Sequence, residues 1–448
     1  MANNAKGLMQ KTLIKNGISF YPPTYEVKPI NILITDDTIS QVSEKEIPTT
    51  PDMMIYDVAG NLVVPGFMDC HTHLSQSFGR GIYDNLHLTQ WLLTMIENFD
   101  LTEEESYLAT QLGCIEAIKS GTTTVAEMTT AGPYHEACIQ AIADSGLRGD
   151  VCMALGDFQE GDGPPPEKNA SQLLDDMRDL HQQWHGKYDD RITVRVSPVG
   201  LPACTEELIR GSRDLANELG VGIHIHNCEG DTETANAYDR FNMSEVETYE
   251  KFGLLGPDCQ LVHNIWLNDH DKELIAEYNC SVVTCPSTNT KVTDGMPPMP
   301  DLHKLGVNIA IGCDGESSSG TYDMLQEARL VALLGKVSTM NAAMFTAEET
   351  YEMMTKNGLE AIGFDTKVGE IKPGYKADLT VIKYPAPHLI DETRLLSNLI
   401  YSATGGDVLS VMVDGKPLYW NGEMTQIDEQ VVLAHILDVM RKGKHLIP

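Results

Sequence analysis

Histidines at a two-residue spacing are the first sign of chemistry in this sequence. His71 and His73 end the apolar run VVPGFMDCHTHL. Residues i and i+2 of a strand point to the same side, so both imidazoles can reach one metal ion. A second pair, His224 and His226, lies in the run GVGIHIHNCE. We expect His226 to face the metal and His224 to be a core residue one layer below it.

Further polar side chains fall at the ends of other apolar runs. His263 lies in CQLVHNIW, and Asp314 lies near the end of GVNIAIGCDG. Glu229 follows His226 by three residues. Imidazole nitrogens and a carboxylate form a ligand set that suits Zn²⁺ and Fe²⁺, and such an ion lowers the pKa of bound water toward about 7. The pattern predicts a hydrolytic metal site.

The carboxyl group of Glu229 is not needed as a ligand and can serve as an acid and base. It could protonate a ring nitrogen of a substrate and later deliver a proton to a departing amine. His263 could orient the attacking water, and Asp314 could accept a proton from it. A substrate with a carbon between a ring nitrogen and an amino group fits these roles, and its products would be an oxo compound and ammonia.

The apolar runs that carry these residues recur eight times, and most gaps between them have helical patterns. Capping-box spacing marks helix starts at Thr102, Ser244 and Thr346. Eight strands that alternate with helices predict an α/β fold of the (β/α)8 TIM-like barrel type, with reacting groups at the carboxyl ends of the strands. A doubly wound sheet is the alternative, but it would not usually need eight units. The runs are 63–74, 122–128, 148–155, 192–200, 220–229, 259–266, 280–289 and 306–315.

Both ends of the chain read as short strands separated by turns. Each end is too small to build a good core alone. We therefore predict a composite β-sandwich domain from residues 1–62 and 367–448, the latter including a C-terminal tail, beside a metal-dependent catalytic barrel at 63–366. The Gly- and Pro-rich loop 156–170 would lie on the substrate side of the barrel.

Composition narrows the functional classes. The 448 residues hold 32 Lys and Arg against 65 Asp and Glu, a formal charge of −33. This balance argues against nucleic acid or anionic membrane surfaces as partners. No apolar run is long enough for a membrane span, and the first residues do not read as a secretory signal. The ten cysteines have no CxxC spacing, so we expect buried, reduced thiols and a cytoplasmic protein.

Four motifs in this order resemble the amidohydrolase superfamily, specifically its mononuclear aminohydrolase branch, which includes cytosine, guanine, S-adenosylhomocysteine and triazine-acting enzymes. They are VVPGFMDCHTHL, HIHNCEG, LVHNIWL and GCDGESSSG, and GEIKPGYKADLTVI extends the resemblance to nearly the whole chain. The resemblance implies a distorted barrel with one Zn or Fe ion, and of the two we expect Zn. The segment ITVRVSPVG has no Lys that could bridge a second ion. The implied ligands are His71, His73, His226 and Asp314, with Glu229 as proton shuttle and His263 beside the water.

Substrate contacts are harder to assign. The resemblance suggests Gln76 and Ser318 as substrate-binding residues, and Trp91 could form an aromatic wall. Phe78, Arg80 and Tyr83 are weaker candidates in the same loop as Gln76. Adenosine-type members usually read Ser-Pro-His where this chain reads Ser-Pro-Val at 197–199, which favours bases and triazines over nucleosides.

We therefore expect a metal-dependent hydrolytic deaminase of a small amino-substituted heterocycle or cyclic amidine, such as a triazine, pyrimidine or purine base. A hydrolase that expels chloride or an alkylamine from the same site is the main alternative. A silent scaffold would have lost ligands, and a dinuclear amidase would need a Lys on the fourth strand. The expected partner is a small molecule, and the resemblance suggests a homodimer or larger homo-oligomer.

Overall fold

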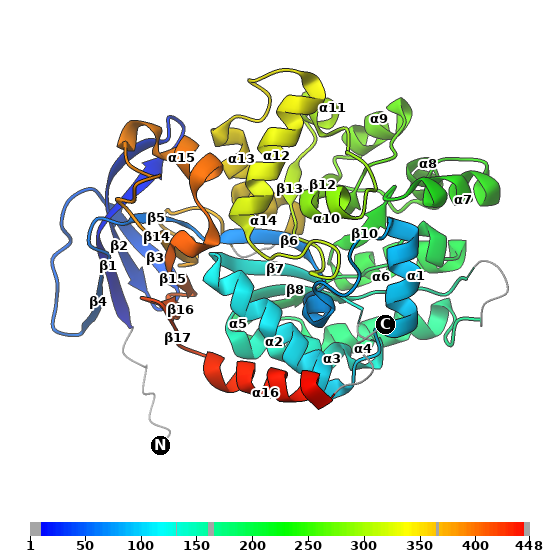
Figure 1. Cartoon of the computed structure of the whole chain (residues 1–448), viewed down its shortest axis with the longest axis horizontal. Helices are drawn as coiled ribbons and strands as arrows, with labels where there is room; N and C mark the ends of the chain where they lie inside the picture. Colours follow the sequence, from blue (N-terminus) through cyan, green and yellow to red (C-terminus); the bar gives the residue numbers. More distant parts are fainter. Residues whose placement is uncertain (1–9, 131, 160–164, 364–366, 443–448) are drawn as a thin grey trace.

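The computed structural model describes residues 10–130, 132–159, 165–363 and 367–442 (Figure 1). Every apolar run predicted as a strand between residues 63 and 315 contains one. The eight strands form two parallel four-stranded sheets in the orders β6-β7-β8-β9 and β10-β11-β12-β13. Their bounds are β6 Phe67–Thr72, β7 Thr122–Thr129, β8 Arg148–Met153, β9 Ile192–Val194, β10 Ile223–Asn227, β11 Cys259–His263, β12 Ser281–Thr284 and β13 Ile309–Ile311.

The two sheets meet at isolated parallel bridges on both edges. Thr72 pairs with Asp314 on one edge, and Val196 pairs with Ile223 on the other. The fold is therefore TIM-barrel-like, as predicted, but its strands do not form one continuous ladder. The strands at both seams are short: β9 and β13 have three residues each. Asp314 also has a left-handed backbone with φ 66°, which ends regular pairing there.

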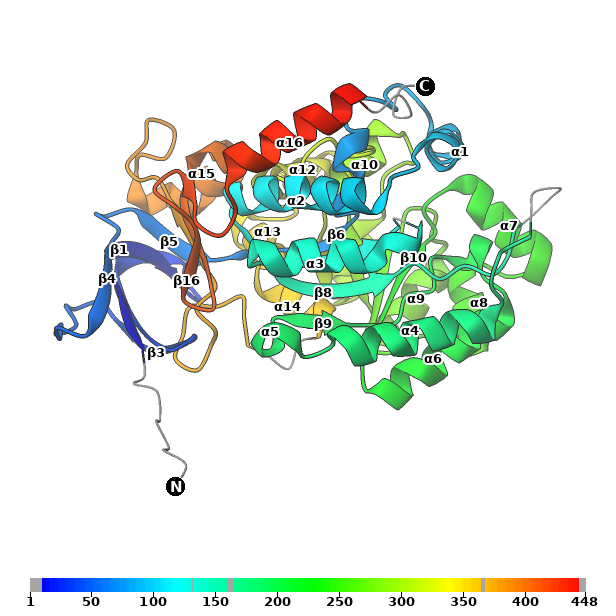
Figure 2. The ribbon, with the colours of Figure 1, turned by 90° about the horizontal axis from the view of Figure 1, so that it is seen from below.

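Helices pack outside these strands, as Figure 2 shows for α2, α3, α4 and α6. The expected capping boxes at Thr102, Ser244 and Thr346 are all formed, and they start α2, α8 and α13. The helices of the central region are α1 Leu88–Asn98, α2 Glu103–Lys119, α3 His135–Ser145, α4 Ala170–Trp184, the short α5 Lys187–Asp190, α6 Glu206–Leu219, α7 Asp231–Phe241, α8 Glu245–Phe252, α9 Asp269–Glu277, α10 Pro286–Lys291, α11 Met299–Lys304, α12 Met324–Thr339, α13 Ala347–Met353 and α14 Lys356–Ile362.

Both ends of the chain contribute strands to one further sheet. Its order is β17-β16-β15-β14-β5-β1-β2-β3, with β4 paired to β1. The pairing is that of one curved nine-stranded sheet, so the two separate sheets of a sandwich are not seen in the described residues (Figure 2). The strands are β1 Lys11–Tyr21, β2 Glu26–Thr35, β3 Thr38–Ser43, β4 Met53–Asp57, β5 Leu62–Pro65, β14 Leu379–Ile382, β15 Val408–Val413, β16 Lys416–Trp420 and β17 Glu423–Met424.

A buried ion cluster joins this sheet to the central strands. Nε of Arg148, on β8, lies 2.9 Å from a carboxylate oxygen of Asp378, and its Nη2 lies 2.5 Å from Asp414. Arg148 is 0% exposed. Because a buried charge needs partners, the cluster couples the two parts of the molecule.

The terminal tail also contains helices that the strand pattern did not predict. They are α15 Leu395–Ser402 and α16 Glu429–Lys442, and α16 packs beside α2 (Figure 2).

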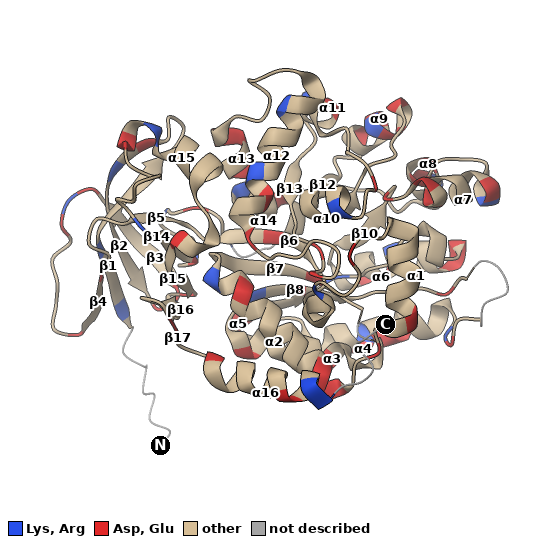
Figure 3. Cartoon of the chain, viewed as in Figure 1, with Lys and Arg blue, Asp and Glu red and all other residues tan. Residues whose placement is uncertain are grey.

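All ten cysteines are buried and free, as expected. Acidic side chains occur on many helices (Figure 3). In the part of the chain that the structure describes, none of the helices combines the length and apolarity of a membrane span.

Candidate active site

Side chains from four strand ends converge on one point. His71 lies near the end of β6 and His73 just after it, His226 lies on β10, His263 ends β11, and Asp314 follows β13. Oδ1 of Asp314 lies 3.4 Å from Nε2 of His71 and 3.3 Å from Nε2 of His73. The ligand atoms of His71, His73 and Asp314 all lie within 4.8 Å of one another, as do those of His71, His226 and His263. The spacing suits one metal ion.

The imidazoles are held through their Nδ1 atoms. Nδ1 of His73 lies 2.7 Å from the carbonyl oxygen of Met128, and Nδ1 of His226 lies 2.6 Å from that of Val199. A carbonyl only accepts, so in both rings Nδ1–H donates and Nε2 keeps its lone pair. Outer-shell hydrogen bonds of this kind fix ring orientation in metal sites.

His71 is oriented by another histidine. Its Nδ1 lies 2.8 Å from Nε2 of His224, which is 0% exposed. The expected core residue His224 is thus buried as anticipated, but it also supports a candidate ligand. Nε2 of His71 is buried and has no hydrogen-bond partner among the described residues. A metal ion would satisfy this lone pair, so the residues present fit such an ion.

The backbone is strained where two of these side chains leave their strands. His263 has φ 72° and Asp314 has φ 66°, both in the left-handed region that L-residues rarely adopt. The N–H of Asp314 donates to the carbonyl of His71 at 2.8 Å, which fixes one strand end against the other. Strain of this kind collects at functional sites.

Burial sets the protonation of the ligand groups. Desolvation lowers the pKa of His71 to about 3 and holds the pKa of His226 well below its usual value. Burial opposes ionisation of Asp314, but the imidazoles of His71 and His73 hold its pKa well below the ordinary range. Neutral imidazoles and an ionised carboxylate are the forms that bind a metal.

Glu229 lies beside this group, at the edge of a cluster of carboxyl groups. Its Oε1 is 3.5 Å from Nε2 of His263, whose Nδ1 donates to Oδ1 of Asn289 at 3.0 Å. Burial, together with the charges of Glu233 and Asp294, raises the pKa of Glu229 well above its usual value. The carboxyl group can therefore hold a proton at neutral pH.

A pocket opens over these residues. Its lining includes Glu229 and three of the four candidate ligands, His73, His226 and Asp314. Two of the predicted substrate contacts, Gln76 and Trp91, also line it. None of the described residues that line it is Lys or Arg. The full lining is His73, Gln76, Leu88, Trp91, Leu92, Met95, Thr130, Val199, Gly200, Pro202, Ala203, His226, Glu229, Glu233, His263 and Asp314.

Other predicted residues lie elsewhere. Ser318 is not part of the pocket lining, and its hydroxyl instead donates to Oδ2 of Asp314 at 3.1 Å. Phe78 and Tyr83 are buried in the core, and Arg80 forms an ion pair with Glu116. These contacts make Ser318 a support for Asp314, and they leave the other three outside the pocket. In the loop 156–170, residues 160–164 lie outside the described part.

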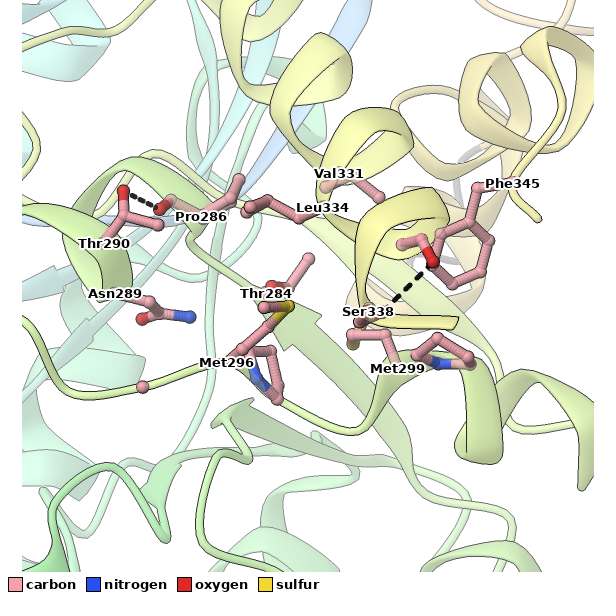
Figure 4. Close-up of a pocket in the computed structure, with 14 residues that line it drawn as sticks. Thr284, Pro286, Asn289, Thr290, Met296, Met299, Val331, Leu334, Ser338 and Phe345 are labelled. Carbon is pink, nitrogen blue, oxygen red and sulfur yellow. Dashed lines mark hydrogen bonds between the residues drawn. The ribbon is translucent and has the colours of Figure 1, made fainter. Parts of the chain in front are cut away.

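A second pocket lies behind α10 (Figure 4). It is lined mainly by apolar side chains, including Met299, Val331, Leu334 and Phe345. Asn289, the partner of His263, forms part of its wall (Figure 4). It gathers no charged or metal-binding side chains, so the chemistry belongs to the pocket over His73.

Several pocket residues were missed from sequence. Glu233 stands three residues after Gly230 at the start of α7, and its carboxylate accepts from the Gly230 N–H at 3.2 Å. This capping spacing was a signal of a helix start, but it did not indicate a pocket. Asn289 and Asp294 follow β12 and had no distinctive spacing.

Comparisons with known proteins find relatives that match the chain along most of its length. A model of the amidohydrolase family matches residues 62–418. A 5-methylthioadenosine/S-adenosylhomocysteine deaminase from Thermococcus onnurineus is 35% identical over 414 residues, which are 92% of this chain and 95% of that protein.

Solved structures resemble the chain along nearly its whole length. An adenosine deaminase from Xanthomonas campestris with bound zinc has a TM-score of 0.88 at 26% identity, covering 97% of this chain and 98% of that one. Atrazine chlorohydrolase from Arthrobacter aurescens has a TM-score of 0.89 at 19% identity, covering 96% and 100%, and this likeness concerns the fold.

Proposed function

The chain belongs to the amidohydrolase family and is an aminohydrolase, and we propose that its substrate is an aminopurine, as base or nucleoside. The observation that carries this proposal is the convergence of a metal-ligand set and the carboxyl group of Glu229 at one pocket. Hydrolytic deamination needs both a nucleophile at the amino-bearing carbon and an acid at the adjacent ring nitrogen.

We assign one divalent ion, Zn²⁺ rather than Fe²⁺, to His71, His73, His226 and Asp314. Three imidazoles and a carboxylate suit zinc, and the similar adenosine deaminase structure has bound zinc. When bound, such an ion supplies a hydroxide nucleophile near neutral pH. The short strand β9, Ile192–Val194, holds no Lys for a second ion.

Side chains of the pocket carry out the proton transfers and orient the attacking water. Glu229 donates its proton to the ring nitrogen beside the amino-bearing carbon, which makes that carbon electrophilic. His263 is held by Asn289 and orients the attacking water with Nε2. Asp314 accepts a proton from the water, and Ser318 holds its Oδ2. Glu229, left ionised by this step, takes the proton of the new hydroxyl group as the carbonyl forms and passes it to the departing amine, which leaves as ammonia. The proton held by Asp314 then returns Glu229 to its acid form.

The walls of the pocket suit a flat, uncharged ring. Trp91, Leu88 and Met95 face it from α1, and Val199 and Pro202 line it from the segment after β9. Burial of an aromatic ring between apolar groups is favourable, and the absence of Lys or Arg from the described lining disfavours anionic substituents.

A second candidate activity is the expulsion of chloride or an alkylamine from a triazine. The segment Gly200-Leu201-Pro202, which resembles the triazine-hydrolase arrangement, contributes Gly200 and Pro202 to the pocket wall. The attacking half of the machinery would be the same.

The test is a turnover assay with metal-replete enzyme on adenine, adenosine, 5′-deoxyadenosine, guanine and chlorotriazines. Release of ammonia with replacement of NH2 by OH on a purine supports the proposal. Release of chloride or alkylamine, without purine turnover, would replace it with the second candidate.

A further inference from the structure

Asp294 is a buried acid without an evident role. The residue is 3% exposed, and both of its carboxylate oxygens are buried without a hydrogen-bond partner among the described residues. Buried polar groups in native proteins are nearly always paired, so such a carboxylate calls for an explanation.

The backbone of Asp294 is fixed on both sides. Its N–H donates to the carbonyl of Asn289 at 3.1 Å, and its own carbonyl accepts from Nε1 of Trp266 at 3.1 Å. The flanking residues Thr293 and Gly295 both have positive φ, 60° and 133°. The side chain of Asp294 is therefore positioned by a tight turn with fixed backbone hydrogen bonds.

This turn lies beside Glu229, because Asn289, to which Asp294 is hydrogen-bonded, holds the imidazole of His263, and Nε2 of His263 lies 3.5 Å from Oε1 of Glu229. The carboxyl groups of Asp294 and Glu229 are near enough for each to shift the pKa of the other. Two ionised carboxylates only accept hydrogen bonds and repel each other, so they share a site only when one of them carries a proton. Glu233 from α7, Asp314 after β13 and His263 from β11 are the other titratable groups near Glu229. Burial raises the pKa of both carboxyl groups, but their mutual contact raises the pKa of Glu229 and lowers that of Asp294, so the proton of the pair lies on Glu229.

We propose that Asp294 is a positioning residue for Glu229. Its carboxylate accepts a hydrogen bond from the protonated carboxyl group of Glu229 and holds that acid in the orientation that faces the pocket. The inference rests on the proposed function, since it assigns a support to the acid of that reaction.

The same segment then supports both halves of the chemistry. Asn289 on α10 receives the Nδ1–H of His263, and Asp294 follows on the turn after that helix. One short segment would thus orient the histidine beside the water and the acid beside the substrate.

The first experiment compares wild type with Asp294→Asn, which keeps the side-chain size and removes its charge. We expect kcat to fall at least about tenfold, a fraction of what loss of an acid/base group costs, with KM and bound metal nearly unchanged. Loss of the neighbouring negative charge lowers the pKa of Glu229, so its proton is lost at lower pH. The alkaline limb of the kcat–pH profile should therefore move to lower pH.

The matched control is Asp271→Asn, another buried aspartate, whose side chain accepts from Ser244 and caps α9 outside the pocket lining. It should leave kcat and the alkaline limb in place. If Asp294→Asn does not fold, Asp294→Ser provides the same comparison. The inference would be wrong if the Asp294 variant kept the wild-type kcat and the alkaline limb of its pH profile did not move. If Glu229→Gln were inactive in the same assay, the role of Glu229 would still stand.

An infrared measurement decides the point without turnover. Wild type minus Glu229→Gln at neutral pH should show the stretch of a protonated carboxyl group, and this band should shift or vanish in Asp294→Asn. An identical band in the Asp294 variant would refute the contact between Asp294 and Glu229, whether or not a purine is the substrate. Failure of the proposed function would show differently, as no release of ammonia by the wild-type enzyme.

Discussion

Nε2 of His71 lies 3.4 Å from Oδ1 of Asp314, at the point where the first and the last central strand meet. The bridge between Thr72 and Asp314 brings these side chains together from distant parts of the chain. Assembly of the metal site thus depends on the closure of the two sheets at this seam.

Substitution of His71 tests the ligand set. His71→Ala should bind no stoichiometric metal and lose turnover, because the site would lose one of its four ligands and the partner of His224. Elemental analysis of the dialysed protein measures this. His270→Ala, an exposed histidine on α9, should bind metal as wild type does. Full metal occupancy in His71→Ala would refute the assignment.

Substitution of Glu229 separates acid catalysis from metal binding. Glu229→Gln should keep one metal ion and lose about 10²–10⁴-fold in kcat, the usual cost of removing an acid/base group. Metal analysis and steady-state rates on the same preparation check both parts. An unchanged rate would remove Glu229 from the mechanism.

Trp91 tests the apolar wall. The residue lines the pocket, and its Nε1 donates to the carbonyl of Ser317 at 3.3 Å. Trp91→Ala should raise KM about tenfold or more with a smaller change in kcat, since lost apolar burial weakens ground-state binding. Leu93→Ala on the same helix, at a side chain that is 58% exposed, should leave KM unchanged. Equal KM values for the two variants would mean that Trp91 serves the fold instead.

The buried ion cluster tests how the end sheet is coupled to the central strands. Arg148→Met leaves the carboxylates of Asp378 and Asp414 buried without their cation. The free energy of unfolding should fall by about 3–5 kcal/mol, as for other broken buried pairs. Denaturant unfolding measures the change.

The control for that measurement is Arg178→Met, which removes an exposed ion pair with Glu218. Exposed pairs contribute about 0–1 kcal/mol, so this variant should unfold almost as wild type does. Comparable losses of unfolding free energy in both variants would show that the buried cluster stabilises the protein no more than an exposed ion pair does.

Much of the fold could be predicted because local patterns determined it. Apolar runs mark the eight central strands, and capping boxes mark the starts of α2, α8 and α13. The helix α16 was missed because a strand-rich end segment favoured further strands. The two sheets join at single bridges because the strands there are short and because Asp314 has a left-handed backbone. The hydrophobic pattern of the sequence predicts neither feature. The division into domains stays a prediction.

The residues of the site likewise fall into some that the sequence predicts and some that it does not. His71, His73 and His226 were found because a strand places residues i and i+2 on one side. The roles of Asn289, Asp294 and Glu233 arise only when distant segments pack together, and no spacing in the sequence marks them. Val199 favoured bases over nucleosides, whereas the relative from Thermococcus onnurineus is named for nucleoside substrates, and the assay below compares both.

The central claim is that this pocket deaminates an aminopurine. The most direct measurement is mass spectrometry of the products formed by metal-replete wild type from adenine and its nucleosides, with ammonia measured in the same reaction. We expect a purine in which OH replaces NH2, one ammonia for each product molecule, and loss of both in Glu229→Gln. Unchanged purines in the presence of one bound metal ion would contradict it.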